Sequence, residues 1–489
     1  MVNCPVHRQA MGAPHRLALV AGQRRLSFSE LDAEVASWVG QLLARGVGRG
    51  ARVAVLAWNG VASVALLFAT GRLGATLVPL NARLTQAELA PLLRRVQPRA
   101  VFAEEALCAR LPEAECLEAV ERAPRRPAPA GQGLGLEEDW AVLFTSGTTG
   151  QPKGARLPQR AFFASAAASR ANLGASSSDR WLCNLPLFHV GGLAMAVRCA
   201  LDGAALVLQP RFDAEATARA FSDKEVTHAS LVARTLELSL EAGARVGALR
   251  ALLLGGGPLP AELAMRARRG GFPVLQTYGL TETCSQVATE RPAEADGSSS
   301  GPALPGLLLR VCGADGVPLA VGEPGEIRVQ GPTVMTGYLD DEEASARALA
   351  GGWLRTGDVG VLDPLGRLKV LARRLDLILS GGENVYPAEV EAVLSAHPGV
   401  AEAAVVGRSD ATWGEVPVAA VVLRPGAEAK DLLQWARSRL AGFKVPAEVV
   451  AVASLPRTAA EKVDRVALRR SLIAASGGAP EGASRKGRL

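Results

Sequence analysis

Three features of the sequence predict an α/β protein with a large N-terminal domain of βαβ-type sheets, a β-rich subdomain and a small α+β C-terminal domain. Stretches of helical composition alternate with short apolar runs over residues 24–98, as in a parallel sheet. Residues 306–371 have the texture of short strands separated by Gly/Pro turns. After Arg373, roughly 100 residues form an α+β pattern, which suffices for a domain.

The first part of the chain supplies the βαβ pattern in order. A Pro/Gly-rich connection at residues 123–135 separates it from a second unit, in which an apolar strand, a glycine-rich loop and a helix follow one another. The same succession recurs at residues 249–269, and ligands bind at the carboxyl ends of such strands. We expect helices at 29–45, 60–73 and 159–172, and strands at 53–57, 76–79 and 140–144.

The C-terminal part predicts a smaller unit after a short hinge. Helices are expected at 387–396 and 428–440, and strands near 401–406 and 416–423. The last residues lack apolar periodicity, which predicts disorder. The expected organisation is an N-terminal domain at 1–372, a hinge at 373–376, a C-terminal domain at 377–475 and a disordered tail at 476–489.

Composition excludes several functional classes. The chain of 489 residues is 48% hydrophobic, without an apolar run long enough for a membrane span or a secretory signal at its start. Seven scattered cysteines without C-x-x-C spacing favour the reducing cytoplasm. The five histidines lie far apart, so a zinc site is not expected, and the net charge of +6 is too dispersed to indicate nucleic acid. Any metal is expected to be Mg²⁺ that arrives with a nucleotide.

The segment TSGTTGQPKG, residues 145–154, is the strongest chemical motif. It follows an apolar strand and combines three glycines, four hydroxyls and Lys153, one of only seven lysines among 54 basic residues. Glycines let backbone N–H groups approach phosphate oxygens, while hydroxyls and a lysine add donors and charge. Because Gly154 follows Lys153, the motif is not a Walker loop. The predicted phosphate-binding residues are Thr145, Ser146, Gly147, Thr148, Thr149, Gly150 and Lys153.

This loop resembles the signature of the AMP-forming adenylate-forming superfamily, which includes acyl-CoA synthetases. Further segments match in the expected order: YGLTE at 278–282, TGD at 356–358, Arg373 at the hinge, SGGENVY at 380–386 and Lys462. The resemblance covers residues 15–472. It implies ATP and Mg²⁺ as cofactors, coenzyme A as co-substrate, and a C-terminal domain that rotates between adenylation and thioester formation. It also allows a homodimer.

The resemblance implies a role for each matching residue. Attack of a carboxylate on the ATP α-phosphate brings negative charges together, so Lys462 is expected to bridge them. Glu282 is expected to hold Mg²⁺, with Thr281 bonded to the α-phosphate. Asp358 would accept the ribose hydroxyls. The remaining expected nucleotide contacts are Gly255, Gly256, Gly257, Tyr278, Gly279 and Arg373, and those of the coenzyme A step are Gly381, Gly382 and Glu383.

The chain also departs from the family pattern at two places. Ala372 stands where many members have glycine, and Leu375 occupies the usual hinge pivot. Ala460 and Glu461 replace the usual Ser-Gly before Lys462. Altered energetics of domain rotation are therefore expected.

The acid-binding site is expected in segments 185–193 and 277–287. His189 in the string LPLFHVGGL is expected to line the acyl site, where it is also counted among the catalytic residues. The strings FHVGGL, YGLTETCSQ and SGGENVYPAEVE are similar to those of o-succinylbenzoate-CoA ligases of menaquinone biosynthesis, whose substrate is a dianion. Burying its second carboxylate requires polar partners. The predicted acid-binding residues are His189, Gly191, Gly192, Thr277, Ser285 and Gln286.

Two other functions remain open at this stage. One is a CoA ligase for another aromatic or short-chain acid, which the pocket residues do not distinguish. The other is a catalytically silent nucleotide-binding regulator, against which the presence of Lys153, Glu282, Asp358 and Lys462 argues.

Overall fold

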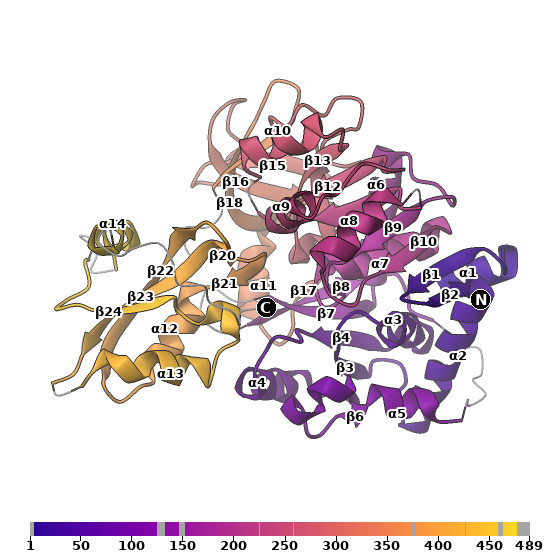
Figure 1. The fold of residues 1–489 in the computed structure, drawn as a ribbon, viewed down its shortest axis with the longest axis horizontal. Coiled ribbons are helices and arrows are strands. Elements are labelled where there is room, and N and C mark those ends of the chain that lie inside the picture. Colours follow the sequence, from indigo (N-terminus) through magenta and orange to yellow (C-terminus); the bar gives the residue numbers. More distant parts are fainter. Residues whose placement is uncertain are drawn as a thin grey trace. The chain divides into compact units, whose positions relative to one another are not determined.

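The computed structural model shows an α/β chain that divides into two compact units (Figure 1). It describes residues 4–124, 133–145, 152–223, 225–257, 259–372, 377–425, 427–457 and 463–476. Unit 1 comprises residues 1–82, 93–144 and 154–373, and unit 2 comprises residues 83–92, 145–153 and 374–489. The predicted fold class is confirmed by these sheets and helices. Among the described helices, none has the length and apolar character needed to cross a membrane.

A seven-stranded sheet is built mainly from parallel strands, as the alternation in residues 24–98 predicts. Helix α3 (Val61–Leu73) joins β3 to β4 and is buried around nearly its whole circumference, which explains its apolar sequence. It begins after Gly60 and ends at Gly74, whose φ of 70° suits glycine at a helix end. The strand order is β17 (Gly337–Tyr338), β8 (Lys153–Pro158), β7 (Asp139–Thr145), β4 (Thr76–Leu80), β3 (Arg52–Leu56), β5 (Ala100–Ala103) and β6 (Glu115–Cys116).

An eight-stranded sheet carries the second βαβ succession. The predicted strand, glycine turn and helix at 249–269 form β12 (Ala251–Leu254) and α10 (Ala261–Arg269). Helix α7 (Val190–Asp202) connects β9 to β10. The remaining order is β14 (Ser285–Thr289), β13 (Val274–Leu280), β12, β11 (His228–Leu231), β9 (Arg180–Cys183), β10 (Ala205–Leu208), β1 (Leu17–Ala21) and β2 (Arg24–Ser27).

The β-rich segment forms a four-stranded antiparallel sheet. Its strands are β15 (Leu308–Cys312), β16 (Gly325–Gln330), β18 (Leu354–Leu362) and β19 (Leu368–Ala372), in that order. One part of the segment leaves this sheet, because β17 pairs with β8 of the seven-stranded sheet. Helix α11 (Glu342–Ala348) follows β17 and is capped by the side chain of Asp341.

The other helices of unit 1 cover the two large sheets. Helix α2 (Phe28–Ala44) starts at a capping box in which Ser27 and Glu30 satisfy each other's backbone N–H groups, and it packs on α3. Helix α6 (Gln159–Leu173) matches the predicted helix at 159–172 and packs on α7. Further helices are α1 (Pro5–Gly12), α5 (Leu117–Arg122), α8 (Ala214–Ser222) and α9 (Ala233–Glu241); α4 (Gln86–Val96) is divided between the units.

Unit 2 is built on a five-stranded sheet. Its strands are β20 (Ile378–Ser380), β21 (Glu383–Val385), β22 (Val400–Asp410), β23 (Gly414–Leu423) and β24 (Glu448–Ala451), with helices α12 (Pro387–Ser395), α13 (Leu432–Arg437) and α14 (Arg465–Ser476). The single helix predicted at 428–440 is wrong in extent: a 3₁₀ turn (Ala429–Asp431) precedes α13. The hydroxyl of Ser438 donates to the carbonyl of Trp435, which competes with continuation of the helix. The predicted disordered tail lies outside the described residues after 476.

Unit 2 also buries an ion cluster around Lys444. The Lys444 Nζ atom lies 2.6 Å from Oε1 of Glu389 on α12 and 2.8 Å from Oε1 of Glu88 on α4. Burial raises the pKa of Glu389. Burial alone would lower the pKa of Lys444, but the two carboxylates outweigh it and raise that pKa. The charge of Lys444 is therefore compensated within the unit.

Candidate functional site: an adenylate site and a buried arginine

Tyr278 and Asp358 form the best-defined part of the predicted nucleotide site. The Tyr278 hydroxyl, on β13, donates to Oδ2 of Asp358 on β18 at 2.8 Å. The backbone N–H of Asp358 donates to Thr356 Oγ1 at 3.1 Å, and Thr356 donates to the carbonyl of Ile327 at 2.7 Å. Asp358 is 7% exposed. One carboxylate oxygen is thus held by the protein, while the other keeps acceptor capacity for a hydroxyl pair.

Glycines allow close backbone approach beside this pair. Gly255, Gly256 and Gly257 follow β12, and a Cβ on Gly255 would lie 2.9 Å from Cγ2 of Thr277. Gly256 has φ of 78°, which disfavours any residue with a side chain. At Gly279 a Cβ would lie 1.7 Å from the carbonyl oxygen of Ser285. Three successive residues without side chains therefore follow β12, which would let a planar base lie against the backbone.

Glu282 offers a hard oxygen ligand from a short 3₁₀ turn (Thr281–Thr283). Its Oε1 accepts a hydrogen bond from the Tyr338 hydroxyl at 2.8 Å, and its carbonyl accepts one from the N–H of Met335 at 2.8 Å. Within the described parts of the chain, Glu282 forms no ion pair with lysine or arginine. A half-buried carboxylate with fixed backbone and no protein counter-ion fits Mg²⁺, which needs few protein oxygens besides phosphate oxygens.

His189 and two glycines lie at the start of α7. His189 precedes the first residue of the helix, and its ring contacts Phe188 edge-on at a centroid distance of 4.8 Å. Gly192 is required by packing, because a Cβ there would lie 2.4 Å from the carbonyl oxygen of Pro186. Gly191 is less tightly enclosed, since a Cβ there would lie 3.0 Å from a methyl group of the Leu185 side chain.

Thr277 and Gln286 are brought together by the antiparallel pairing of β13 and β14. Gln286 Nε2 donates to Thr289 Oγ1 at 3.3 Å and reaches Thr277 Oγ1 at 3.5 Å; the hydroxyls of Thr277 and Thr289 are 2.8 Å apart. Ser285 begins β14 with φ of 90°. Two of the three predicted polar acid-binding residues thus share one buried hydrogen-bond network.

Arg198, which the sequence reasoning missed, completes this network. Its Nη2 donates to Gln286 Oε1 at 3.0 Å, and its guanidinium lies 4.8 Å from the centre of the Trp181 ring. Arg198 is 3% exposed, and among the described residues it forms no ion pair; its Nε has no hydrogen-bond partner. Asp202, one turn further along α7, bonds instead to Arg170. Burial lowers the pKa of Arg198. Arg198 could have been found from the sequence, because it is a charged residue within the otherwise apolar helix sequence VGGLAMAVRCALD.

Trp181 also stacks on a histidine that carries no charge at neutral pH. The rings of Trp181 and His228 are 4.6 Å apart and inclined by 21°. Burial lowers the pKa of His228 to about 4. Its Nδ1 lies 2.9 Å from Thr227 Oγ1. The cationic charge in this stack is therefore that of Arg198.

Several predicted site residues lie outside the described residues. These are Ser146, Gly147, Thr148, Thr149 and Gly150 of the phosphate loop, Arg373 of the hinge and Lys462. The two described ends of the loop lie on neighbouring strands: Thr145 ends β7, Lys153 begins β8, and the Thr145 hydroxyl donates to the Lys153 carbonyl at 3.4 Å.

The loop predicted to serve the coenzyme A step is a tight turn between β20 and β21. Gly381 and Gly382 have φ of 60° and 85°. The Gly381 N–H donates to the carbonyl of Trp413 at 2.8 Å, and a Cβ on Gly381 would lie 2.6 Å from the Trp413 ring. Glu383 is buried and pairs with Arg83 within unit 2. Both glycines are therefore required by the backbone itself.

Comparison with known proteins assigns the class. The AMP-binding enzyme family matches residues 6–339, and the AMP-binding enzyme C-terminal domain matches residues 389–462. The chain belongs to the AMP-binding enzyme family.

Its relatives include 2-succinylbenzoate–CoA ligases. That of Bacillus licheniformis is 40% identical, with 92% of this chain and 96% of the relative aligned. That of Geobacillus kaustophilus is 42% identical over 95% and 96% of the two chains. A solved double mutant of o-succinylbenzoate CoA synthetase from Bacillus subtilis, bound to the product analogue OSB-NCoA, is 36% identical; the alignment covers 95% and 98% of the chains with a TM-score of 0.91. The same enzyme with the acyl-adenylate OSB-AMP gives a TM-score of 0.73 at 36% identity over 99% of both chains.

Proposed function

We propose that this chain activates o-succinylbenzoate with ATP and transfers the acyl group to coenzyme A, releasing AMP and pyrophosphate. The relatives named above support this activity, and one observation in the structure supports the acid. Arg198 is a buried cation that forms no ion pair among the described residues, and it is hydrogen-bonded to Gln286 in the network that also contains Thr277. An anion bound there would compensate a charge that is otherwise costly to bury.

The acid's two carboxylates need different treatment. The succinyl carboxylate reacts, whereas the aromatic carboxylate must be held without reacting. Arg198 is suited to the second task because its guanidinium can hydrogen-bond both oxygens of a carboxylate. A monocarboxylic acid would leave the arginine uncompensated, so the site would select dicarboxylates by penalising the others.

For adenylation we assign the nucleotide contacts from the positions of the site residues described above. Asp358, positioned by Tyr278, accepts the ribose hydroxyls, and the base lies against the glycines after β12. Glu282 holds Mg²⁺, which neutralises phosphate charge when bound. Thr281 bonds to the α-phosphate, and His189 lines the acyl site.

The remaining roles belong to residues of the phosphate loop, the hinge and unit 2. Lys462 bridges the carboxylate and the α-phosphate, and Lys153 contacts the departing phosphates. Gly381, Gly382 and Glu383 shape the turn that serves thioester formation, in which the coenzyme A thiolate attacks the acyl carbonyl and AMP leaves. All seven cysteines are free, which supports a location in the reducing cytoplasm. The pathway that we propose is menaquinone biosynthesis, and the proposal includes a homodimer.

The decisive assay compares o-succinylbenzoate with a matched acid that lacks only the aromatic carboxylate, 4-oxo-4-phenylbutanoate. Purified protein, ATP, Mg²⁺ and coenzyme A are incubated with each acid and with benzoate, and nucleotides and acyl-CoA are identified by mass spectrometry. We expect AMP and o-succinylbenzoyl-CoA, with much slower turnover of the two monocarboxylates. Release of ADP, or equal turnover of the matched acid, contradicts the proposal.

A further inference from the structure

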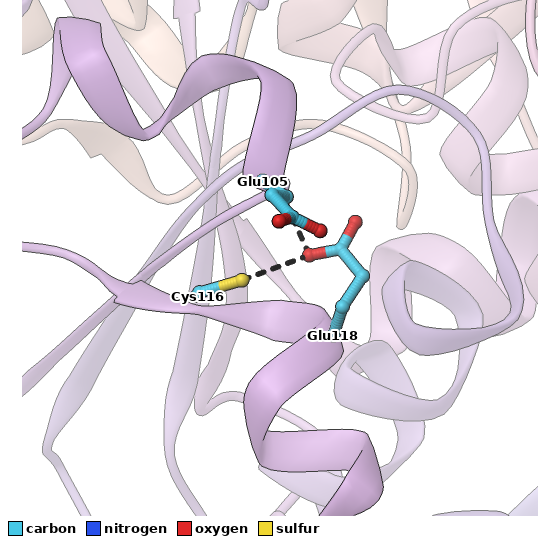
Figure 2. Close-up of side chains that lie close together, drawn as sticks. All are labelled: Glu105, Cys116 and Glu118. Carbon is cyan, nitrogen blue, oxygen red and sulfur yellow. Dashed lines mark hydrogen bonds between the residues drawn. The ribbon is translucent and has the colours of Figure 1, made fainter.

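Three side chains of types that can ligate a metal lie close together at the β6 edge of the seven-stranded sheet, on other elements than those that carry Tyr278, Glu282 and Asp358 (Figure 2). Glu105 begins a 3₁₀ helix (Glu105–Arg110), Cys116 ends the edge strand β6, and Glu118 lies in the first turn of α5. The potential ligand atoms of these three residues all lie within 4.8 Å of one another. They come from a short segment, so their spacing is fixed locally.

Hydrogen bonds already orient the side chains of Cys116 and Glu118. The Cys116 thiol donates to Oε2 of Glu118 at 3.2 Å, and the same oxygen accepts the backbone N–H of Glu105 at 2.9 Å (Figure 2). This arrangement has a structural role by itself, because Glu118 satisfies an N–H at the start of the 3₁₀ helix. It leaves Oε1 of Glu118 and both carboxylate oxygens of Glu105 free for a further ligand.

Cys108 adds a second sulfur to the group. It lies three residues after Glu105, and a 3₁₀ helix with three residues per turn places these two side chains on the same face. Burial raises the pKa of Cys108, and the neighbouring Cys116 thiol and the Glu118 and Glu105 carboxylates raise it further. The Cys108 thiol donates to the carbonyl oxygens of Glu104 at 3.5 Å and Ala103 at 3.7 Å, and a bound cation would replace these two contacts.

The carboxylates of this group lack a cationic partner in the part of the chain that the structure describes. Among the described residues, no lysine or arginine pairs with Glu105 or Glu118. The nearby arginines are engaged elsewhere: Arg45 pairs with Glu115, and Arg110 donates to the carbonyl of Ala82. Two thiols and two carboxylates with no cationic partner are suited to a cation.

We propose that Glu105, Cys108, Cys116 and Glu118 bind one divalent cation of the Zn²⁺ class. A tetrahedral site with metal–sulfur bonds of ~2.3 Å and metal–oxygen bonds of ~2.0 Å needs donors about 3.3–3.8 Å apart. The potential ligand atoms of Glu105, Cys116 and Glu118 lie within 4.8 Å of one another, so side-chain rotations must bring them and the Cys108 thiol to this spacing. Thiolates select Zn²⁺ over Mg²⁺ or Ca²⁺, which prefer oxygen ligands alone. The site is therefore separate in both place and chemistry from the carboxylate of Glu282.

The bound cation would tie three elements together. The 3₁₀ helix, the edge strand β6 and the start of α5 each contribute a ligand, so binding stabilises the exposed edge of the seven-stranded sheet. Binding releases the thiol protons, because thiolates are the metal ligands, and the affinity must therefore fall as the pH is lowered. The sequence lacks paired histidines, and the site uses none.

The test uses the reduced, full-length protein freed of metal and titrated with Co²⁺, a coloured substitute for Zn²⁺, and then with Zn²⁺. We expect one equivalent of Co²⁺ with a thiolate-to-cobalt charge-transfer band that Zn²⁺ abolishes. Cys116→Ser and Cys108→Ser should each lower the affinity by about 100-fold or more and weaken the band, as loss of a direct ligand exceeds the ~10–100-fold effect of losing an outer-shell partner. Glu118→Gln should lower the affinity with the band retained.

Two control variants probe specificity. Glu113→Gln changes an exposed carboxylate of the same segment outside the group, and Cys312→Ala removes a buried thiol elsewhere; both should bind Co²⁺ as the unaltered protein does. Melting curves in EDTA establish that each variant is folded. Equal binding by Cys116→Ser, or a bound cobalt without a thiolate band, overturns the proposal. Acid adenylation is measured on the same samples and should be unchanged in all variants, so this result and that for the proposed function are independent.

Discussion

Arg198 of unit 1 and Lys444 of unit 2 are both buried cations, but their surroundings differ. Lys444 contacts the carboxylates of Glu88 and Glu389, which raise its pKa despite burial. In the described part of the chain, Arg198 donates to the amide of Gln286 and lies over the ring of Trp181 without forming an ion pair, and burial lowers its pKa. The charge of Lys444 is compensated by carboxylates of the protein, whereas the charge of Arg198 is compensated only when an anion binds. The two residues should therefore respond to mutation in opposite ways.

The largest effect is expected from Lys444→Met, which leaves two buried carboxylates without a counter-ion. Breaking a buried pair by removing one partner costs about 3–5 kcal/mol, and we expect a loss of this size in the free energy of unfolding in urea. Lys430→Met, which removes an exposed lysine paired with Glu428, should cost less than ~1 kcal/mol. Adding Glu389→Gln to Lys444→Met should recover part of the loss. Similar small effects of both lysine variants would remove the distinction.

Arg198→Met should impair acid selection while leaving the fold intact. The loss of a buried charge pair with the substrate, about 3 kcal/mol, corresponds to a decrease of roughly 100-fold or more in kcat/KM for o-succinylbenzoate. Turnover of 4-oxo-4-phenylbutanoate should not fall, and the free energy of unfolding should stay the same or rise. Arg219→Met, an exposed arginine paired with the exposed Glu215, serves as the matched control. Equal losses for both acids would show that Arg198 does not recognise the second carboxylate.

His228 provides a third buried basic group, one that remains neutral. Its folded pKa of about 4 lies below the unfolded value near 6.5, so the unfolded chain takes up a proton first as the pH falls. Stability should therefore be unaffected above pH ~6.5, decrease between pH ~6.5 and ~4 by no more than about 3 kcal/mol, and level off below. His228→Asn should reduce this acid-dependent loss in urea unfolding at a series of pH values, whereas a variant at the exposed His15 should not. An unchanged slope in His228→Asn contradicts the assignment.

The smallest expected effect concerns a neutral partner of a charge. Tyr278→Phe removes the hydrogen bond to Asp358, and a hydrogen bond to a charged group contributes about 1.5 kcal/mol. We expect the KM for ATP to rise roughly tenfold while the KM for the acid stays constant. Initial rates at varied ATP and fixed saturating acid measure this. A change confined to the acid would mean that Asp358 and Tyr278 do not serve the nucleotide.

The elements of the fold could be predicted where local sequence determines burial. Helix α3 and strands β3 and β4 have apolar runs bounded by glycines, and the structure buries them as expected. The helix expected at 428–440 was overextended because a hydroxyl bond to a carbonyl in its last turn is invisible in composition. The pairing of β17 with β8 of another sheet joins residues far apart in the sequence, and the local sequence pattern does not predict such a pairing.

The candidate site was predictable where its residues are neighbours in sequence. Thr277 and Gln286 lie on two strands joined by a tight turn, so their proximity follows from a hairpin. Arg198 is 88 residues from Gln286, and only the packing of α7 on the sheet brings it there. Ser285 was placed with the polar group, but its positive φ gives it a backbone role that residue type does not reveal.

The turn between β13 and β14 has a consequence for how acid preference can change over evolution or by design. Cys284 and Ser285 both have positive φ, and the Ser285 carbonyl lies where any side chain at Gly279 would be. The backbone of this region therefore tolerates little alteration. New acid specificities must therefore arise from changes of side chains rather than of this backbone. At the buried pair of Arg198 and Gln286, a single substitution alters the charge that the acid must carry.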